Sequence, residues 1–204
     1  GEVVVPVNLT KENTIEVSVA SRLGVRVTQV TQADLGLLRQ GYFGLNTSDM
    51  ERQRAFYDKL GFIGEIYPAG PETSTTFAQS LGFPDDYLIH VSLHSLEDPP
   101  TPPFVDTVQF RGDSYREEPP YVNLNHIGMA YATYSTADLD GDYAYLMAEG
   151  VEFVSEPTTA PNGERFVFLK DQDGTFLKLI EESGAAPTDG PDLVRLVNTN
   201  MNVA

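Results

Sequence analysis

The sequence predicts an α+β protein built from two paired β-α-β-β-β modules, whose strands form one curved eight-stranded sheet around a cavity. Two observations predict this class. The same order of strand-like and helix-like segments occurs twice, over residues 41–111 and 125–182, and a glycine ends the helical segment in both copies, Gly61 and Gly150. One helix cannot cover both faces of a four-stranded sheet. Two modules side by side solve this problem, because the helices cover the outer face of the joint sheet and the inner faces enclose a cavity.

The first module opens with a strand over residues 42–47. Ser48 or Asp49 can cap the helix that follows, over residues 50–60, and Glu51 adds charge near its N-terminus. Strand-like and turn-like composition places the remaining elements. They are strands at 62–67, 87–95 and 104–111, a short helix at 73–81 and a proline-rich loop at 97–103.

The second module follows a linker over residues 112–124, which contains Pro119-Pro120. Its elements repeat the order of the first. They are a strand at 125–133, a helix at 136–149, and strands at 151–154, 165–170 and 175–182, with a turn at 171–174. An N-terminal extension (1–40) and a C-terminal tail (183–204) flank the modules. The extension has strand-like runs at 3–7, 14–19 and 25–30 and a helix-like run at 32–40, and the tail has a short helix near 193–197.

Composition excludes several partners. The chain carries 30 acidic and 13 basic residues, a formal net charge of −17, so we expect no nucleic-acid partner and no anionic membrane surface. The absence of cysteine excludes disulfides and thiolate chemistry. No leader segment is visible. Localisation stays open, with a soluble cytoplasmic protein as the default expectation.

Several motifs occur in a fixed order along both modules. They are YFGLNTSDME at 42–51, LGF at 60–62, HIGMAY at 126–131, GVEF at 150–153 and DQDGTFLKL at 171–179. Together these motifs resemble the vicinal-oxygen-chelate superfamily, which includes glyoxalases, bleomycin-resistance proteins and extradiol dioxygenases. The resemblance implies a small-molecule site between the modules. It does not fix the reaction, because this fold supports many.

In that superfamily, metal ligands lie on the first and last strands of each module. The resemblance assigns these positions to Tyr42, Asp106, His126 and Lys178. Tyr42 replaces a common His or Gln, and Lys178 replaces a common Glu. A protonated lysine has no lone pair for a cation. We therefore expect no cofactor and no metal, and if a divalent metal does bind, His126 and Asp106 are its ligands.

Strand parity adds candidates for ligand binding. Alternation in the strand 87–95 places His90, Ser92 and His94 opposite the apolar Ile89, Val91 and Leu93. The apolar side should face the helices, so His90 and His94 would line the cavity together with His126. By the same parity, Asn46 and Phe176 share faces with Tyr42 and Lys178. The alternative is that His90 and His94 are polar positions on a partly exposed strand.

Two residues have alternative roles at this stage. Lys178 acts as a base or an imine-forming amine if an apolar cavity lowers its pKa, or it forms an ion pair with Asp106 and neutralises a former metal site. Tyr42 acts as an acid or hydrogen-bond donor toward a substrate oxygen, or it is an ordinary residue of the cavity wall.

Three functions remain open. The first is an isomerase or lyase that moves a proton with Tyr42, Asp106, His126 and Lys178, and their convergence favours it. The second is a resistance-type protein that binds a small molecule without turnover, favoured by the lost metal ligands. The third is a metal-dependent lyase or dioxygenase with a rearranged site. The expected partner is a small organic molecule, and the extension (1–40) either packs on the body or mediates a homodimer.

Overall fold

The structure is a computed structural model of the 204-residue chain. It describes residues 7–9, 14–17, 30–31, 42–66, 79, 82, 88–111, 123–125, 128–184 and 190–202. Within these residues no helix is long and apolar enough to cross a membrane.

The described residues of the first module form a four-stranded sheet and a ten-residue helix. Its elements are β4 (Tyr42–Asn46), α2 (Met50–Lys59), β5 (Gly64–Ile66), β6 (Leu88–Ser95) and β7 (Phe104–Arg111). The strand order is β4-β7-β6-β5, so the first and last strands of the module are neighbours and run parallel. Helix α2 packs against β6 and β7.

The second module repeats this arrangement. Its elements are β8 (Gly128–Thr136), α4 (Leu139–Ala148), β9 (Glu152–Phe153), β10 (Thr158–Thr159), β11 (Arg165–Lys170) and β12 (Phe176–Glu181). The first and last strands, β8 and β12, are again parallel neighbours, and α4 packs against β11 and β12. The predicted α+β class is therefore confirmed. The predicted β-α-β-β-β order occurs in the first module, and the second module contains it with the two-residue strand β10 in addition.

The described strands of the two modules are not hydrogen-bonded into one eight-stranded sheet. In the described part of the chain they form a four-stranded and a six-stranded sheet. The second sheet has the order β10-β11-β12-β8-β13, with β9 paired to β11. Its additional strand β13 (Leu193–Asn202) pairs antiparallel with β8. The short helix expected near 193–197 is wrong, because the free edge of β8 offers this Leu/Val-rich segment a strand partner.

Three short strands precede the modules: β1 (Val7–Leu9), β2 (Thr14–Val17) and β3 (Val30–Thr31). They form an antiparallel sheet in the order β1-β2-β3, which agrees with the strand-like composition of the extension. The helix-like run at 32–40 lies outside the described residues, as does most of the short helix expected at 73–81.

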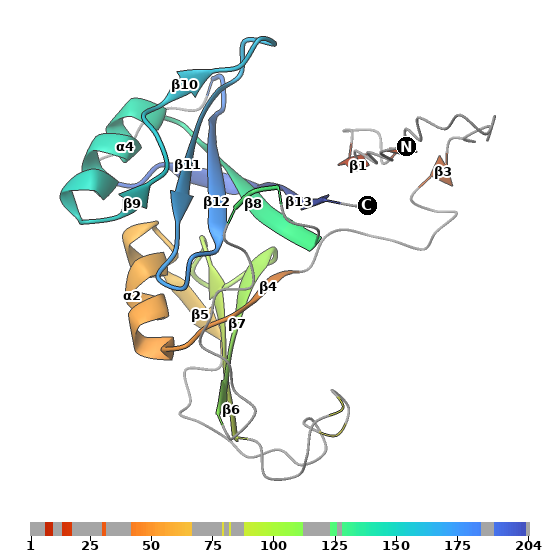
Figure 1. Cartoon of the computed structure of the whole chain (residues 1–204), viewed down its shortest axis with the longest axis vertical. Coiled ribbons are helices and arrows are strands. Elements are labelled where there is room, and N and C mark those ends of the chain that lie inside the picture. The colour runs from red at the N-terminus through yellow and green to blue at the C-terminus, as the bar shows by residue number, and fades with distance from the viewer. Residues whose placement is uncertain are drawn as a thin grey trace.

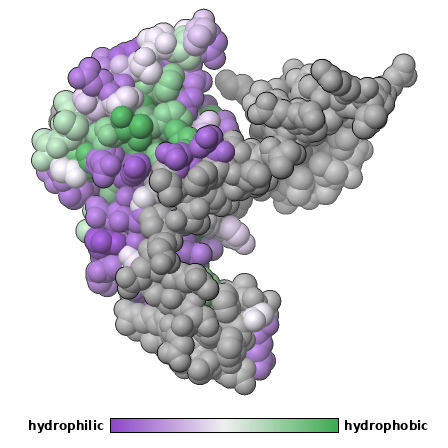
Figure 2. Space-filling view, in the orientation of Figure 1, coloured by the Kyte–Doolittle hydropathy of each residue, from purple (hydrophilic) through white to green (hydrophobic). Residues whose placement is uncertain are grey.

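One apolar core lies between the sheets and the helices. Figure 1 shows α2 and α4 on the same side of the two sheets. The core cluster contains residues of both modules, and the Phe62 ring meets the Tyr134 ring edge-on at 5.6 Å between centroids. Figure 2 shows a mostly hydrophilic described surface around α2 and an apolar area in the region of the second sheet. Among the described residues, α2 and α4 leave the opposite faces of the two sheets uncovered.

Candidate functional site

We call the faces of β4, β7, β8 and β12 that are turned away from α2 and α4 the site face. In the first module, Phe43, Leu45 and Val105 are buried in the core, so the residues between them point the other way. Tyr42 and Asp106 therefore lie on the site face. The β4–β7 register places Gly44 directly opposite Asp106. A Cβ atom built on Gly44 would have nothing within 4 Å, so there is open space beside the Asp106 position.

A capped helix fixes where each opening strand ends. Asp49 caps α2, and its Oδ1 accepts a hydrogen bond of 3.1 Å from the Arg52 backbone N–H. Asp138 caps α4 in the same way, with the Gly141 backbone N–H at 2.9 Å from its Oδ1. The two caps therefore define equivalent positions in the two modules.

Counting back from the caps identifies the residue of the second module that is equivalent to Tyr42. Tyr42 precedes its cap by as many positions as Tyr131 precedes Asp138. The sheet registers agree: Tyr42 pairs with Phe104 and Tyr131 with Phe176. The position that the sequence interpretation assigned to His126 therefore belongs to Tyr131. His126 itself lies outside the described residues.

The same registers relate Asp106 to Lys178. Asp106 stands two residues after Phe104, and Lys178 stands two residues after Phe176. Leu177 and Leu179 are fully buried on the core side, so Lys178 lies on the site face. The four equivalent positions are thus held by two tyrosines, a carboxylate and an ammonium.

The orientation predicted for His90 and His94 is wrong. Both are buried, 8% and 2% exposed, on the side of β6 that faces α2. His94 stacks on the ring of Tyr57 from α2, with 5.7 Å between ring centroids. Burial lowers the pKa of His94 to about 4, so the ring is neutral at pH 7. These histidines belong to the core, and neither lies on the site face.

Polar partners explain why this side of β6 turns inward. The Ser92 hydroxyl donates a hydrogen bond to the Glu65 carboxylate, which also accepts one of 2.6 Å from Arg54 of α2. The burial cost of the polar side chains is therefore offset within the core. The apolar Val91 and Leu93, half-buried, take the opposite face.

Asn46 and Phe176 lie on the side that parity predicts. Asn46 is exposed and shares the site face with Tyr42. Phe176 is 4% exposed, and the ammonium of Lys170 lies 5.3 Å from its ring centroid. A role for either residue in ligand binding stays a prediction.

Asp106 has an unusual environment for a carboxyl group. Its Oδ1 is buried and has no hydrogen-bond partner among the described residues. Burial raises the pKa of Asp106, because the charged form is desolvated. An unpaired, desolvated carboxyl is a group suited to accept a proton from a ligand.

Lys178 has a partner other than the one considered from the sequence. Its ammonium forms an ion pair with Glu164, which lies in the loop between β10 and β11, rather than with Asp106. The same nitrogen lies 4.7 Å from the centroid of the Phe166 ring. Burial, and secondarily the charge of Glu164, raises the pKa of Tyr131. Tyr42, in contrast, is 61% exposed.

These donors do not fit a divalent metal. Of the four equivalent positions, only Asp106 offers an anionic oxygen, while Lys178 brings a positive charge. Within the described ranges, no three His, Cys, Asp or Glu side chains are grouped closely enough to hold a metal ion. We therefore derive no chemical step through a metal.

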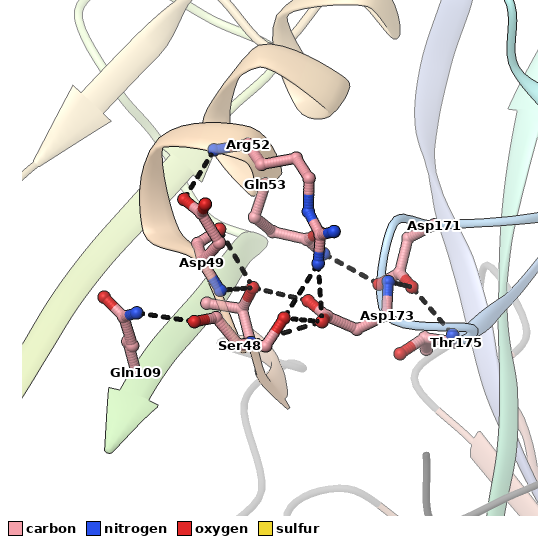
Figure 3. Close-up of polar contacts among 9 residues, drawn as sticks. Ser48, Asp49, Arg52, Gln53, Gln109, Asp171, Asp173 and Thr175 are labelled. Atoms are coloured by element: carbon pink, nitrogen blue, oxygen red, sulfur yellow. Dashed lines mark hydrogen bonds and ion pairs between the residues drawn. The ribbon is translucent and has the colours of Figure 1, made fainter. Parts of the chain in front are cut away.

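A polar network that sequence reasoning missed joins the two modules (Figure 3). The turn between β11 and β12 carries Asp171 and Asp173. Asp171 accepts a hydrogen bond of 2.7 Å from Gln53 of α2, and Asp173 lies 3.1 Å from Arg52 in an ion pair. Asp173 also accepts from the side chains of Thr47 and Ser48. The network holds the opening of α2 against the second sheet.

Residues 39–179 match the family described as Glyoxalase/Bleomycin resistance protein/Dioxygenase superfamily. No curated protein sequence matches the chain.

Two solved structures share the fold. A glyoxalase family protein from Bacillus cereus is 17% identical with a TM-score of 0.60, covering 72% of this chain and 96% of its own. The V278E mutant of glyoxalase I from Zea mays is 16% identical with a TM-score of 0.50, covering 75% of this chain and 47% of its own. At these identities the likeness concerns the fold alone.

Proposed function

Because the chain belongs to the Glyoxalase/Bleomycin resistance protein/Dioxygenase superfamily, matched over residues 39–179, we propose that it binds a small organic molecule on the site face and moves a proton on it without a divalent metal. Isomerase and lyase reactions are the classes that such proton transfer serves.

The observation that carries this proposal is the Asp106 carboxyl. Its buried Oδ1 lacks a partner in the described structure, and the space beside it at Gly44 is open. A carboxylate that is desolvated and unpaired is a stronger base than one in water, because protonation relieves the cost of its buried charge. A ligand C–H or O–H placed at this open position would meet a proton acceptor.

The two tyrosines supply the complementary group. Tyr42 and Tyr131 occupy equivalent positions on the site face, and a phenol can donate a hydrogen bond to a ligand oxygen. Tyr131 keeps its proton at neutral pH, because burial raises its pKa. Proton transfer needs a hydrogen-bond donor and a proton acceptor, and here the tyrosines and Asp106 would supply them.

Binding without turnover is the second candidate. It is favoured by the Lys178–Glu164 ion pair, which neutralises the only cation among the four equivalent positions. A pocket that only binds does not need a charged catalytic lysine.

The two functions differ in deuterium exchange. A panel of small oxo acids, hydroxy acids and aldehydes is incubated with the protein in D2O buffer containing a chelator, and NMR follows both binding and deuterium incorporation at carbon. We expect incorporation with the wild type. Asp106→Asn should lower its rate by about 100-fold or more while ligand still binds, because the general base is lost. The exposed Glu149→Gln is the matched control for loss of a carboxylate and should match the wild type.

A second variant tests the location. Gly44→Val fills the open space on β4 with a side chain that strands tolerate, so it should abolish binding while leaving the fold intact. Binding that Gly44→Val abolishes, without any deuterium incorporation, would support the non-catalytic function. Exchange that requires added metal and survives Asp106→Asn would refute the proposed mechanism.

A further inference from the structure

Lys178 is a fixed cation in the middle of the second sheet. It lies on β12 between β8 and β11, where its direct neighbours in register are Thr133 and Phe168. Its side chain is 16% exposed. Backbone pairing on both sides prevents Lys178 from leaving this place, so any anion that pairs with it must come to the site face.

The anion that pairs with Lys178 is far less constrained. Glu164 belongs to the loop between β10 and β11, at the rim of the sheet, and its side chain is 34% exposed, about twice as exposed as that of Lys178. If Glu164 turned outward, its carboxylate would enter water at little cost. The ion pair can therefore open by a side-chain rotation of Glu164 alone.

The Lys178 ammonium also has N–H donors that Glu164 does not use. An ammonium has three N–H donors, and in the described structure one donates to Glu164 while the nitrogen lies over the Phe166 ring. No other acceptor contacts the nitrogen in that part of the chain. A carboxylate can accept two hydrogen bonds from such a group.

A cluster of aromatic rings extends from the Phe166 ring beside this cation. Phe166 and Phe168 meet at 5.8 Å between ring centroids, and Tyr131 meets Phe168 at 5.0 Å, both edge-to-face. Beside them, the Asn200 side chain from β13 donates a hydrogen bond of 3.2 Å to the Thr133 hydroxyl. A ligand here would find an apolar wall, polar groups at one side and one positive charge.

We infer that Lys178 binds the carboxylate of an aromatic or otherwise apolar organic acid by exchanging it for Glu164, so that Glu164 acts as a displaceable internal competitor. The inference rests on the proposed function and names the class of ligand that the site face takes. The formal net charge of −17 repels anions at long range, so selective binding of an acid requires a local cation of this kind.

The test compares a matched pair of probes, 3-phenylpropanoate and its neutral amide, by calorimetry on the full chain. The wild type should bind the acid more tightly than the amide. Glu164→Gln should raise affinity for the acid by about tenfold, because the competing carboxylate is gone, and leave the amide unchanged. Glu156→Gln is the control, because it removes an exposed negative charge without touching Lys178. Lys178→Met should erase the preference for the acid.

The single variant Lys178→Met leaves the Glu164 carboxylate unpaired and could fold poorly for that reason. The double variant Lys178→Met/Glu164→Gln removes this carboxylate as well, and it should also bind the acid and the amide with equal affinity. Equal affinities of the wild type for acid and amide, or an equal effect of Glu164→Gln and Glu156→Gln, would overturn the inference. So would a failure of both probes to bind. In each of these cases, deuterium incorporation that depends on Asp106 would still support the proposed function. The deuterium experiment therefore distinguishes a failure of this inference from a failure of the proposed function.

Discussion

Protonation of His94 should destabilise the fold as the pH falls. The ring is buried against Tyr57, its Nε2 has no hydrogen-bond partner in the described structure, and burial lowers its pKa from 6.5 to about 4. The facing charges are Glu65, which raises the pKa, and Arg54, which lowers it, and burial outweighs both. The unfolded chain therefore takes up a proton on His94 at a higher pH than the folded chain does.

The sign and size follow from these two pKa values. Above pH 6.5 the ring is neutral in both states, so it causes no pH dependence. Between pH 6.5 and about 4 only the unfolded state is protonated, and the free energy of unfolding falls by about 1.4 kcal/mol per pH unit. The loss reaches about 2 kcal/mol at pH 5 and levels off near 3 kcal/mol below pH 4.

The assay is urea unfolding followed by circular dichroism between pH 7.5 and 4.5, for the wild type and His94→Phe. Phenylalanine keeps the stacking on Tyr57 but carries no titrating group. Other groups, such as Asp106 with its raised pKa, contribute alike to both proteins and cancel in the difference. The wild type should lose about 2 kcal/mol relative to the variant between pH 7.5 and pH 5. Parallel stability curves would show that His94 is solvated and that its assigned burial is wrong.

Three further predictions concern stability. Gly64→Ala should cost about 2 to 3 kcal/mol in urea unfolding, because its Cβ would lie 2.1 Å from a backbone carbonyl oxygen, whereas Gly44→Ala, with open space around it, should stay within about 1 kcal/mol of the wild type. Gln53→Ala should cost about 1 to 3 kcal/mol, because the buried Asp171 carboxylate loses the hydrogen bond from the Gln53 amide, and an unchanged midpoint would contradict the network. Asp106→Asn should raise the melting temperature at pH 7.5, because a carboxyl with a raised pKa is charged there at a cost. That gain should vanish as the pH falls through the raised pKa, and a gain that persists at low pH would argue against desolvation.

The sequence predicts the order of elements well because local signals mark it. Asp49 and Asp138 cap the two module helices, and Gly61 and Gly150 follow them with positive φ angles of 85° and 79°. Such signals act within a few residues, so they can be recognised in the sequence without knowledge of the tertiary structure. The division of the described strands into separate sheets depends on long-range pairing, which no local pattern specifies.

The face of a strand that is turned toward the core is harder to predict when the residues of both faces can be buried. On β6 the apolar side chains favour one orientation, but the partly buried side chains of Glu65 and Arg54 stabilise the other. Tyr131 was missed for a different reason. Residue type favours His126, because histidine is a familiar metal ligand, whereas the spacing to the Asp138 cap indicates Tyr131. The spacing to a helix cap is the more reliable guide, because it follows the backbone.

The C-terminal strand has a consequence for biosynthesis. β13 closes the edge of β8, and its pairing contains three register shifts along one strand. β8 is translated long before β13, so on the ribosome its backbone donors and acceptors at this edge stay unpaired until residues 193–202 emerge. During that interval the second module offers a strand edge to other nascent chains. The irregular register of β13 suits a segment that docks last, since it can fit an edge already shaped by the rest of the sheet.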